Sequence, residues 1–519
     1  MSNEERAAMM NQDEIVSLLA SHQDITRRFE ELQQQLDWFK RQLFGAKSER
    51  HVAIDDSRQL TLGEVAAGEA EPVSSVEVPA HRRTKAHSDS PDEGKLRFDD
   101  SVPVVRCELP VDIPEDQLDQ YERIGQKINR LLAQTPGQFF VREIVRPVYK
   151  KKAAADAIED EIVTAYPLST VFHRSFADVS LLAGILVDKF RYHLPLYRQH
   201  QRMTACGVHI SRGSLTHWVH RTCDLLVPIH EAQLQSIRAS GVLAMDETPI
   251  KAGRKKNKPP GKGQMAAGYF WPLYGDQDEV VFHFAPTRAH KVVNDLLGGF
   301  QGTLVSDGYD AYESFAARNA KVRHAACWVH TRRGFDKALS SDHALAHQAL
   351  GRIAALYEAE QKLRSLKPEQ VLARRAVRCK PVVEDFFNWL RQIQAEQALL
   401  PSSPFAQAAA YALDREEALK VFLEDAAVPL DTNHLERQIR PIAVGRKNWL
   451  FCWTEVGAKY TGVAQSLIST CVLHGVDPWT YLVDVLQRLD THPAAKVSEL
   501  TPRIWKEKFG DNPIPAALP

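Results

Sequence analysis

Two acidic residues each follow an apolar run that predicts a buried strand. Asp246 comes directly after VLAM, and Asp307 comes directly after TLVS. Ligands of α/β sheets bind at the carboxyl edge of the strands, where side chains project from a rigid base. A single acid there is usually a turn or helix cap, but two on one sheet repel each other, and a divalent cation relieves that repulsion. The pattern therefore predicts a metal site containing Asp246 and Asp307.

A third acid is needed to complete such a metal-binding set. Glu436 is the best candidate, because NHLERQIRPIAVGRKN predicts a helix that presents this one Glu among Asn and Arg side chains. A surface ion pair between Glu436 and an Arg at helical spacing is the simpler alternative. Asp431 and Glu455 are competing third acids that the sequence leaves open.

The segments around these acids predict an α/β layer. From residue 241 onward, GVLAMDETPIKA, YFWPLYG and EVVFHFAP predict strands, HKVVNDLLGGF predicts a helix, and GTLVSDGYDAY and KVRHAACWVH predict further strands. This alternation is typical of a sheet covered by helices. Residues from about 335 to 425 have helical periodicity instead.

A helix-turn-helix pattern precedes this layer. A helix is predicted from Leu196, a break at Gly207, and a second helix with Ser211 as its cap. Arg212, Ser214 and His217 lie near the start of that second helix, where base contacts are made in DNA-binding motifs of this kind. An ordinary pair of packed helices explains the same pattern equally well.

The N-terminal part of the chain has a different character. Apolar residues from Ile15 to Leu43 recur in steps of three and four, which favours a coiled-coil dimer over a single packed helix. Residues 51–100 are rich in Ala, Ser, Pro, Glu and Gly, the composition of a linker. FFVREIVRPVYKKK then predicts a strand that leads into a basic loop.

Composition restricts the class of protein. The 519 residues carry 65 Lys and Arg against 66 Asp and Glu, a net charge of −1, and 44% are hydrophobic, as in ordinary globular proteins. Basic patches nevertheless occur, such as the six bases without an acid between Lys251 and Lys262, and these can follow DNA phosphates. Seven scattered cysteines without a CxxC pair, no apparent secretory signal and no long apolar stretch predict a cytoplasmic protein outside the membrane.

The segments VLAMDETPIKAG, TLVSDGYDAY, HAACWVHTRRGFDKAL and LDTNHLERQIRPIAVGRKNWLF, in this order, closely resemble the transposases of the insertion sequence 66 family. This resemblance implies a DDE recombinase with an RNase H-like core, in which Asp246, Asp307 and Glu436 match the three acids. Relatives often carry a four-cysteine zinc ribbon, but the corresponding region here keeps only Cys107. A tetrahedral zinc site needs four ligands, so no zinc is expected.

With this resemblance, the fold class is a multidomain α and α/β protein in which a helical insertion interrupts the RNase H-like core. The predicted parts are a coiled coil at 1–50, a flexible linker at 51–100, a small mixed module at 101–165 in the degenerate zinc-ribbon position, a helix-turn-helix region at 166–232, the first part of the core at 233–338, the helical insertion at 339–425, the last part of the core at 426–475 and a tail at 476–519.

The activity that the resemblance implies is transposition of an insertion sequence. The enzyme would bind the terminal inverted repeats, cleave DNA with two Mg²⁺ or Mn²⁺ ions held by the three acids, and join the 3′-hydroxyl ends to target DNA. Its partners would be DNA, a second copy bound through the coiled coil, and accessory proteins of the same element. The residues predicted to contact DNA are Arg212, Ser214, His217, Lys255, Lys256, His330, Arg332, Arg333, Arg440, Arg446 and Lys447.

Two other functions remain open on the sequence. An end-binding DNA-binding protein or repressor that does no chemistry would retain the same fold. A structure-specific nuclease with an RNase H-like core is a further alternative, which the zipper and helix-turn-helix disfavour because they imply a dimer that selects a DNA sequence.

Overall fold

The computed structural model describes residues 96–516 except 136, 153–161, 169, 173–174, 255–264, 364, 397–399, 450–451 and 453. The predicted coiled coil, nearly all of the predicted linker, and Lys255 and Lys256 lie outside the described residues. Leu96–His209 and Thr216–Pro519 form one compact unit, while Ile210–Leu215 group with the N-terminal residues. None of the described helices is both long enough and apolar enough to cross a membrane.

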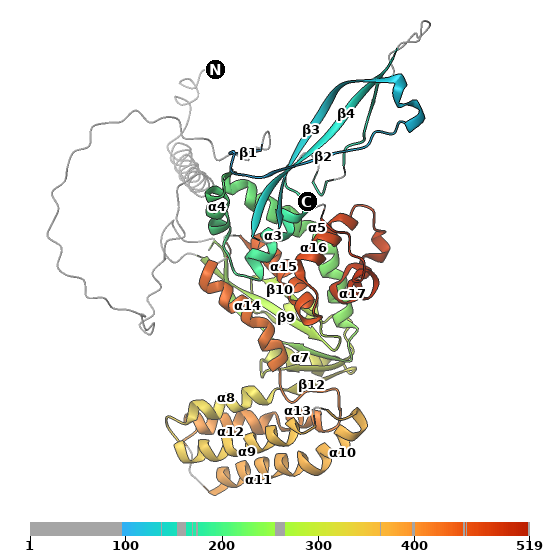
Figure 1. The fold of residues 1–519 in the computed structure, drawn as a ribbon. Helices are drawn as coiled ribbons and strands as arrows, with labels where there is room; N and C mark the ends of the chain where they lie inside the picture. Colours follow the sequence, from blue (N-terminus) through green and yellow to red (C-terminus); the bar gives the residue numbers. More distant parts are fainter. Residues whose placement is uncertain are drawn as a thin grey trace, which may run out of the picture. The chain divides into compact units, whose positions relative to one another are not determined.

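A six-stranded mixed sheet forms the centre of the large unit (Figure 1). Its main path runs β10-β9-β7-β11-β12, and β8 pairs with β9 beside it. β7, β11 and β12 are parallel, whereas β9 is antiparallel to β7, β8 and β10. The strands are β7 (Val242–Met245), β8 (Thr248–Arg254), β9 (Met265–Gly275), β10 (Val280–Ala285), β11 (Gly302–Ser306) and β12 (Val322–Ala326).

Both faces of this sheet are covered, which explains why its strands read as apolar runs. Leu243 and Leu304 pack on one face against a cluster that includes residues of α5 (Arg212–Arg238), α6 (His290–Leu296) and α7 (Asp310–Arg318). On the other face, Ala244 and Val305 share a core with residues of α8 (Trp328–Ala338) and α15 (Glu455–Leu473). The predicted α/β layer is thus confirmed, except that GVLAMDETPIKA is divided into β7 and β8.

A bundle of helices lies in the sequence between β12 and α14 (Asn433–Trp449), where the insertion is predicted (Figure 1). Trp328, Phe335, Phe386 and Phe405 form its aromatic centre, with ring centroids 5.5–5.9 Å apart along the chain of contacts. Its elements after α8 are α9 (His343–Gln361), α10 (Pro368–Arg378), α11 (Lys380–Glu396), α12 (Pro404–Asp414), α13 (Glu416–Lys420) and the short helix η2 (Val421–Leu423).

Helix α15 covers the edge strand of the sheet. The backbone N–H groups of Phe282 and Val280 on β10 donate to Ser466 Oγ at 2.8 Å and to Thr470 Oγ1 at 3.2 Å. These bonds satisfy edge groups that would otherwise attract another strand. The chain then ends in α16 (Pro478–Arg488), η3 (Ala494–Leu500) and α17 (Pro502–Phe509).

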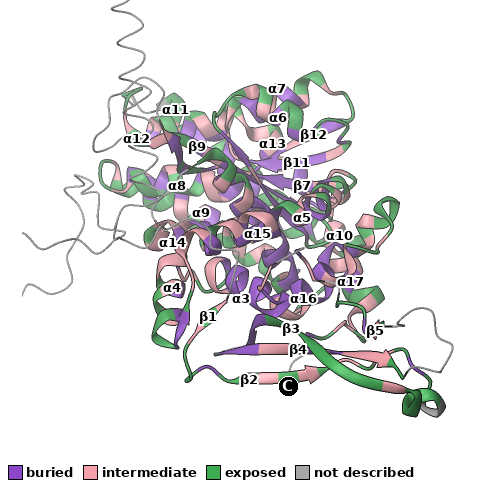
Figure 2. Cartoon of the chain, turned by 90° about the horizontal axis from the view of Figure 1, so that it is seen from above, coloured by how far each residue is buried: buried purple, intermediate pink, exposed green. Residues whose placement is uncertain are grey.

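A smaller sheet with the order β2-β4-β3 precedes the central layer, and β5 also pairs with β4. Figure 2 shows burial concentrated in the central sheet, in contrast with the exposed outer part of β3. Lys150 and Lys151 are paired with Glu122 and Tyr121 on β3, so the predicted basic loop is wrong at these positions and the strand continues through them. The strands are β2 (Val104–Glu108), β3 (Tyr121–Thr135), β4 (Gln138–Lys151) and β5 (Ile162–Thr164), and the short helix η1 (Glu115–Gln120) precedes β3.

Helices at the positions predicted for the helix-turn-helix follow this sheet. α3 (Val179–Phe190) comes first and is almost entirely buried. α4 (Leu196–Ala205) ends before Gly207, whose φ of +80° is readily adopted only by glycine. The turn then contains a short strand, β6 (Val208–His209), which pairs with β1 (Arg97–Phe98) before α5 begins.

Candidate active site at the ends of two parallel strands

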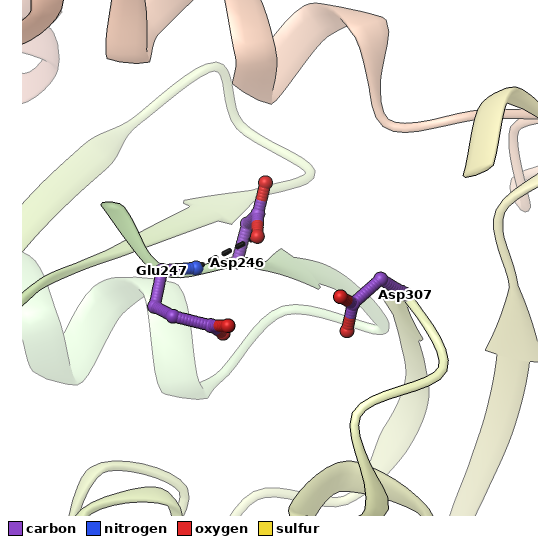
Figure 3. A group of neighbouring side chains, drawn as sticks. All are labelled: Asp246, Glu247 and Asp307. Carbon is purple, nitrogen blue, oxygen red and sulfur yellow. Dashed lines mark hydrogen bonds between the residues drawn. The ribbon is translucent and has the colours of Figure 1, made fainter. Parts of the chain in front are cut away.

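The register of β7 and β11 brings Asp246 and Asp307 to the same level of the sheet. Ala244 pairs with Val305, and each aspartate follows two residues later, directly after the end of its strand. Oxygen atoms of Asp246, Glu247 and Asp307 all lie within 4.8 Å of one another. Figure 3 shows the carboxylates of Glu247 and Asp307 pointing toward each other. Asp246 and Asp307, which the sequence predicts in one metal site, therefore lie close together.

The environment of Asp246 opposes a negative charge. The pKa of this carboxyl is raised to about 7, chiefly by burial and in smaller part by the charges of Glu247, Asp307 and Glu436. One interaction acts the other way, because Asp246 Oδ1 accepts a hydrogen bond of 2.8 Å from the backbone N–H of Glu247. A group of carboxylates crowded in this way is stabilised by a bound cation.

Glu247 is the member of this group that the sequence did not identify. Its Oε1 forms an ion pair with Arg288, and its Oε2 accepts a 2.8 Å hydrogen bond from the hydroxyl of the buried Tyr312. Burial raises the pKa of Glu247, whereas Tyr312 and Arg288 lower it. Its position directly after Asp246 was the only signal available in the sequence.

Glu436 lies on the first turn of α14, close enough for its charge to act on Asp246. It is not one of the three acids whose oxygens lie within 4.8 Å. Its Oε2 accepts a 2.5 Å hydrogen bond from Arg333 Nη2. Its Oε1 is buried and has no hydrogen-bond partner among the described residues. A buried acceptor without a donor is costly, so this oxygen is available to a ligand.

The competing third acids have other neighbours. Asp431 lies just before α14, where its carboxylate accepts hydrogen bonds from the backbone N–H of Asn433 at 2.9 Å and from the Asn433 side chain at 2.7 Å. Glu455 begins α15 beside Gly253, at the far end of β8 from Asp246. Neither acid is among the charges that act on Asp246.

The CWxHxRR segment holds α14 in place. Cys327 and Trp328 are buried, as expected for core residues. The backbone N–H of Thr432 contacts Cys327 Sγ at 3.3 Å, and the backbone N–H of Trp328 donates to Leu430 O at 3.2 Å. These contacts fix the segment just before α14, and thereby the position of Glu436.

The polar residues of this segment are His330, Arg332 and Arg333, and they differ in their contacts with the candidate site. His330 Nε2 lies 3.3 Å from Arg333 Nη1, while Nδ1 is buried without a partner among the described residues. Burial lowers the pKa of His330, although Asp307 and Glu436 act in the opposite direction. Arg332 is about half exposed and lies 4.0 Å from Asp336 on its own helix. Arg333 therefore contacts the predicted third acid, and Arg332 does not.

Among the described residues, the other predicted DNA contacts lie on two helices. Arg212, Ser214 and His217 occupy the first turns of α5, where the Ser211 hydroxyl caps the helix by accepting from the backbone N–H of Ser214 at 3.0 Å. Ser214 itself is only 7% exposed.

Arg440, Arg446 and Lys447 lie on α14. Arg440 and Lys447 are exposed, but Arg446 donates to the carbonyl of Pro249 on β8. Trp449 packs beside Gly445 on the same helix, where a Cβ would come within 2.7 Å of its ring.

Comparisons with known protein families match the region of the chain that carries these acids. The family model described as "Transposase IS66 family" matches residues 174–460, and the "IS66 C-terminal element" matches residues 466–503. A third model, "Transposase C of IS166 homeodomain", matches residues 31–106.

Similar proteins come from Sinorhizobium fredii. The uncharacterized protein y4hP is 29% identical and the match covers 92% of this chain and 88% of that protein. The uncharacterized protein y4jD is 28% identical, with 93% and 96% covered. No solved structure matches the chain.

Proposed function

The chain belongs to the IS66 family of transposases, and we propose that it is a DDE-type enzyme that cleaves and joins DNA at Asp246, Asp307 and Glu436. The observation that carries this proposal is the placement of Asp246 and Asp307 side by side at the carboxyl ends of paired parallel strands. Glu436, held close by the CWxHxRR segment, is the third acid.

The arrangement of the sheet supports an RNase H-like core. If β7 and β8 are counted as one strand, this strand, β9 and β10 form an antiparallel series, and β11 and β12 then run parallel to β7. Asp246 follows β7, in the first strand of this order, and Asp307 follows β11, the fourth strand. In this interpretation, α9–α13 are an insertion between the last strand and the helix that carries Glu436. The domain boundaries expected from the sequence are proposed on the same basis.

The donor set fits Mg²⁺ or Mn²⁺. Hard divalent cations prefer carboxylate oxygens. A cation is favoured here by the crowded carboxylates around the buried Asp246 and by the unpartnered Oε1 of Glu436. Asp246, Asp307 and Glu436 would hold the ions. When bound, two such ions activate the attacking oxygen and stabilise the leaving oxygen of an in-line phosphoryl transfer.

Other residues of the chain orient these acids. The backbone N–H groups of Glu247 and Tyr309 each hold one oxygen of Asp246 and Asp307, at 2.8 and 2.9 Å. Arg333 holds one oxygen of Glu436 and leaves the other free. This division keeps each carboxylate fixed while one of its oxygens stays available, as an organised site requires.

DNA recognition is assigned to α4 and α5 and to the basic residues of α14. The start of α5 presents Arg212 and His217, and α14 presents Arg440 and Lys447. The terminal inverted repeats of the element are the proposed specific ligand. A dimer or larger oligomer formed through residues 1–50, and accessory proteins of the same element, complete the proposed assembly.

A cleavage and strand-transfer assay tests this function. The substrate is labelled duplex DNA carrying the ends that flank the gene, incubated with Mg²⁺ and with wild type, Asp246→Ala, Asp307→Ala or Glu436→Ala. We expect nicked and joined products from the wild type alone, with end binding nearly unchanged in the variants.

Two outcomes contradict the proposal. Full cleavage by Glu436→Ala would remove this residue from the site and direct attention to Asp431 or Glu455. End binding without products from any of the proteins, in the presence of the element's other gene products, would support the repressor instead.

A further inference from the structure

We propose that Arg288 binds a phosphate of the DNA strand at the active site, as a guanidinium held in place by Glu247 and Tyr309. This inference rests on the proposed function and adds a phosphate-binding residue to it. Arg288 lies in the loop between β10 and α6, far in the sequence from the acidic residues, and no sequence pattern singled it out.

Glu247 is better suited to anchoring Arg288 than to binding metal. Both of its oxygens are already engaged, Oε1 by the Arg288 guanidinium and Oε2 by the Tyr312 hydroxyl. Its side chain is only 7% exposed. To bind a metal ion, Glu247 would have to give up its ion pair with Arg288 or its hydrogen bond from Tyr312. Glu247 therefore holds the Arg288 guanidinium in place.

Tyr309 fixes the same arginine from a second direction. The Arg288 guanidinium lies over the Tyr309 ring, 4.0 Å from its centroid, and the Tyr309 hydroxyl donates to the backbone carbonyl of Arg288. The backbone N–H of Tyr309 donates to Asp307 Oδ1 at 2.9 Å. One residue thus connects the orientation of Arg288 with that of a proposed metal ligand.

The guanidinium retains donors for a ligand. It carries five N–H groups, and its ion pair with Glu247 is the only polar contact that the described residues make with it. The Arg288 side chain is 42% exposed. A planar guanidinium with free N–H groups matches the oxygens of a phosphate and can bind two of them at once. The DNA strand that is cleaved at Asp246 and Asp307 would bring its phosphates next to the Arg288 guanidinium.

The closest alternative is that Arg288 only neutralises Glu247 and stabilises the fold. The chain offers a matched control for that role, because Arg323 on β12 forms a 2.6 Å ion pair with Glu424 and its side chain is 48% exposed. Arg323 lies near the start of β12, at the opposite end from the strand termini that carry the acids. Arg323 therefore has the same type of ion-pair partner and a similar exposed fraction, but it lies away from the candidate active site.

The test measures DNA affinity against salt. Wild type, Arg288→Gln, Arg288→Lys and Arg323→Gln are titrated with a fluorescein-labelled duplex carrying the element end, with Ca²⁺ replacing Mg²⁺. We expect Arg288→Gln to bind about ten-fold more weakly, because one charge-assisted hydrogen-bonded contact is lost. The slope of log K against log salt should fall by about 0.9, the amount for one phosphate contact. Arg288→Lys keeps the charge and hence the slope, while Arg323→Gln should match wild type.

A second measurement, of Mn²⁺ binding, tests whether Glu247 anchors Arg288 or binds the metal ion. We expect Arg288→Gln and Glu247→Gln to bind Mn²⁺ as the wild type does, and Asp246→Asn to lose binding. An unchanged salt slope in Arg288→Gln would overturn the inference, and so would loss of Mn²⁺ binding in Glu247→Gln. If the wild type bound no end DNA, the proposed function would fail and the inference with it.

Discussion

Replacing Asp246 by Asn should make the metal-free protein more stable at neutral and alkaline pH. The substitution keeps the size of the side chain and an oxygen that can accept the hydrogen bond from the Glu247 backbone N–H. It removes the negative charge that burial and three neighbouring acids oppose. The variant therefore isolates the electrostatic cost of the site.

The magnitude follows from the pKa of Asp246. Burial, together with the neighbouring carboxylates, raises it from 3.8 to about 7 in the folded protein. Between these two values the folded state retains a proton that the unfolded state has lost, so the free energy of unfolding decreases as pH rises through this window. A shift of about three units at about 1.4 kcal/mol each sets an upper limit of about 4 kcal/mol. Asn does not titrate, so the difference between the proteins should appear between pH 4 and 7 and stay constant above pH 8.

Thermal unfolding of the full chain in EDTA, from pH 5 to 8, measures this difference. Asp246→Asn should melt a few degrees higher than wild type at pH 8, by about 2 °C per kcal/mol, and the gap should close toward pH 5. Added Mn²⁺ should narrow the gap, because it stabilises only the protein that binds it, by about 2.7 kcal/mol at a concentration of one hundred times Kd. An Asn variant that is equally or less stable than wild type at pH 8 in EDTA would refute the reasoning.

Two further predictions concern residues that support the site. Arg375 is only 3% exposed and donates hydrogen bonds to Glu360 and to the carbonyls of Phe422 and Val428, so Arg375→Ala should cost about 3–5 kcal/mol of unfolding free energy in urea titrations. The partly exposed Arg352, as Arg352→Ala, is the control, and a loss below 1 kcal/mol for Arg375→Ala would contradict this. A Cβ on Gly308 would lie 2.5 Å from the Tyr411 ring, so Gly308→Ala should displace the loop after Asp307 and slow cleavage more than it weakens end binding. Adding Tyr411→Ala to this variant should restore part of the cleavage rate, and a double variant without any rescue would contradict the proposed clash.

The sequence by itself determined the parts of the site that are local. Apolar runs predicted the strands that end at Asp246 and Asp307, because a strand buried on both faces excludes polar residues until it leaves the sheet. A glycine and a capping serine likewise predicted where α4 ends and α5 begins, since both signals act within one turn. The match to long motifs assigned the family.

The tertiary structure decided which distant groups meet. Arg288 reaches Glu247 only because β10 and the strands on either side of Glu247 all pair with β9, and no spacing in the chain encodes that contact. Glu436 comes close to Asp246 because buried Cys327 and Trp328 hold the segment before α14. Lys150 was predicted in a loop, but pairing with β3 extends the strand through it, because cross-strand hydrogen bonds outweigh local preference. Local patterns thus specify strands, caps and acids, whereas the partners of each charge depend on packing between elements far apart in sequence.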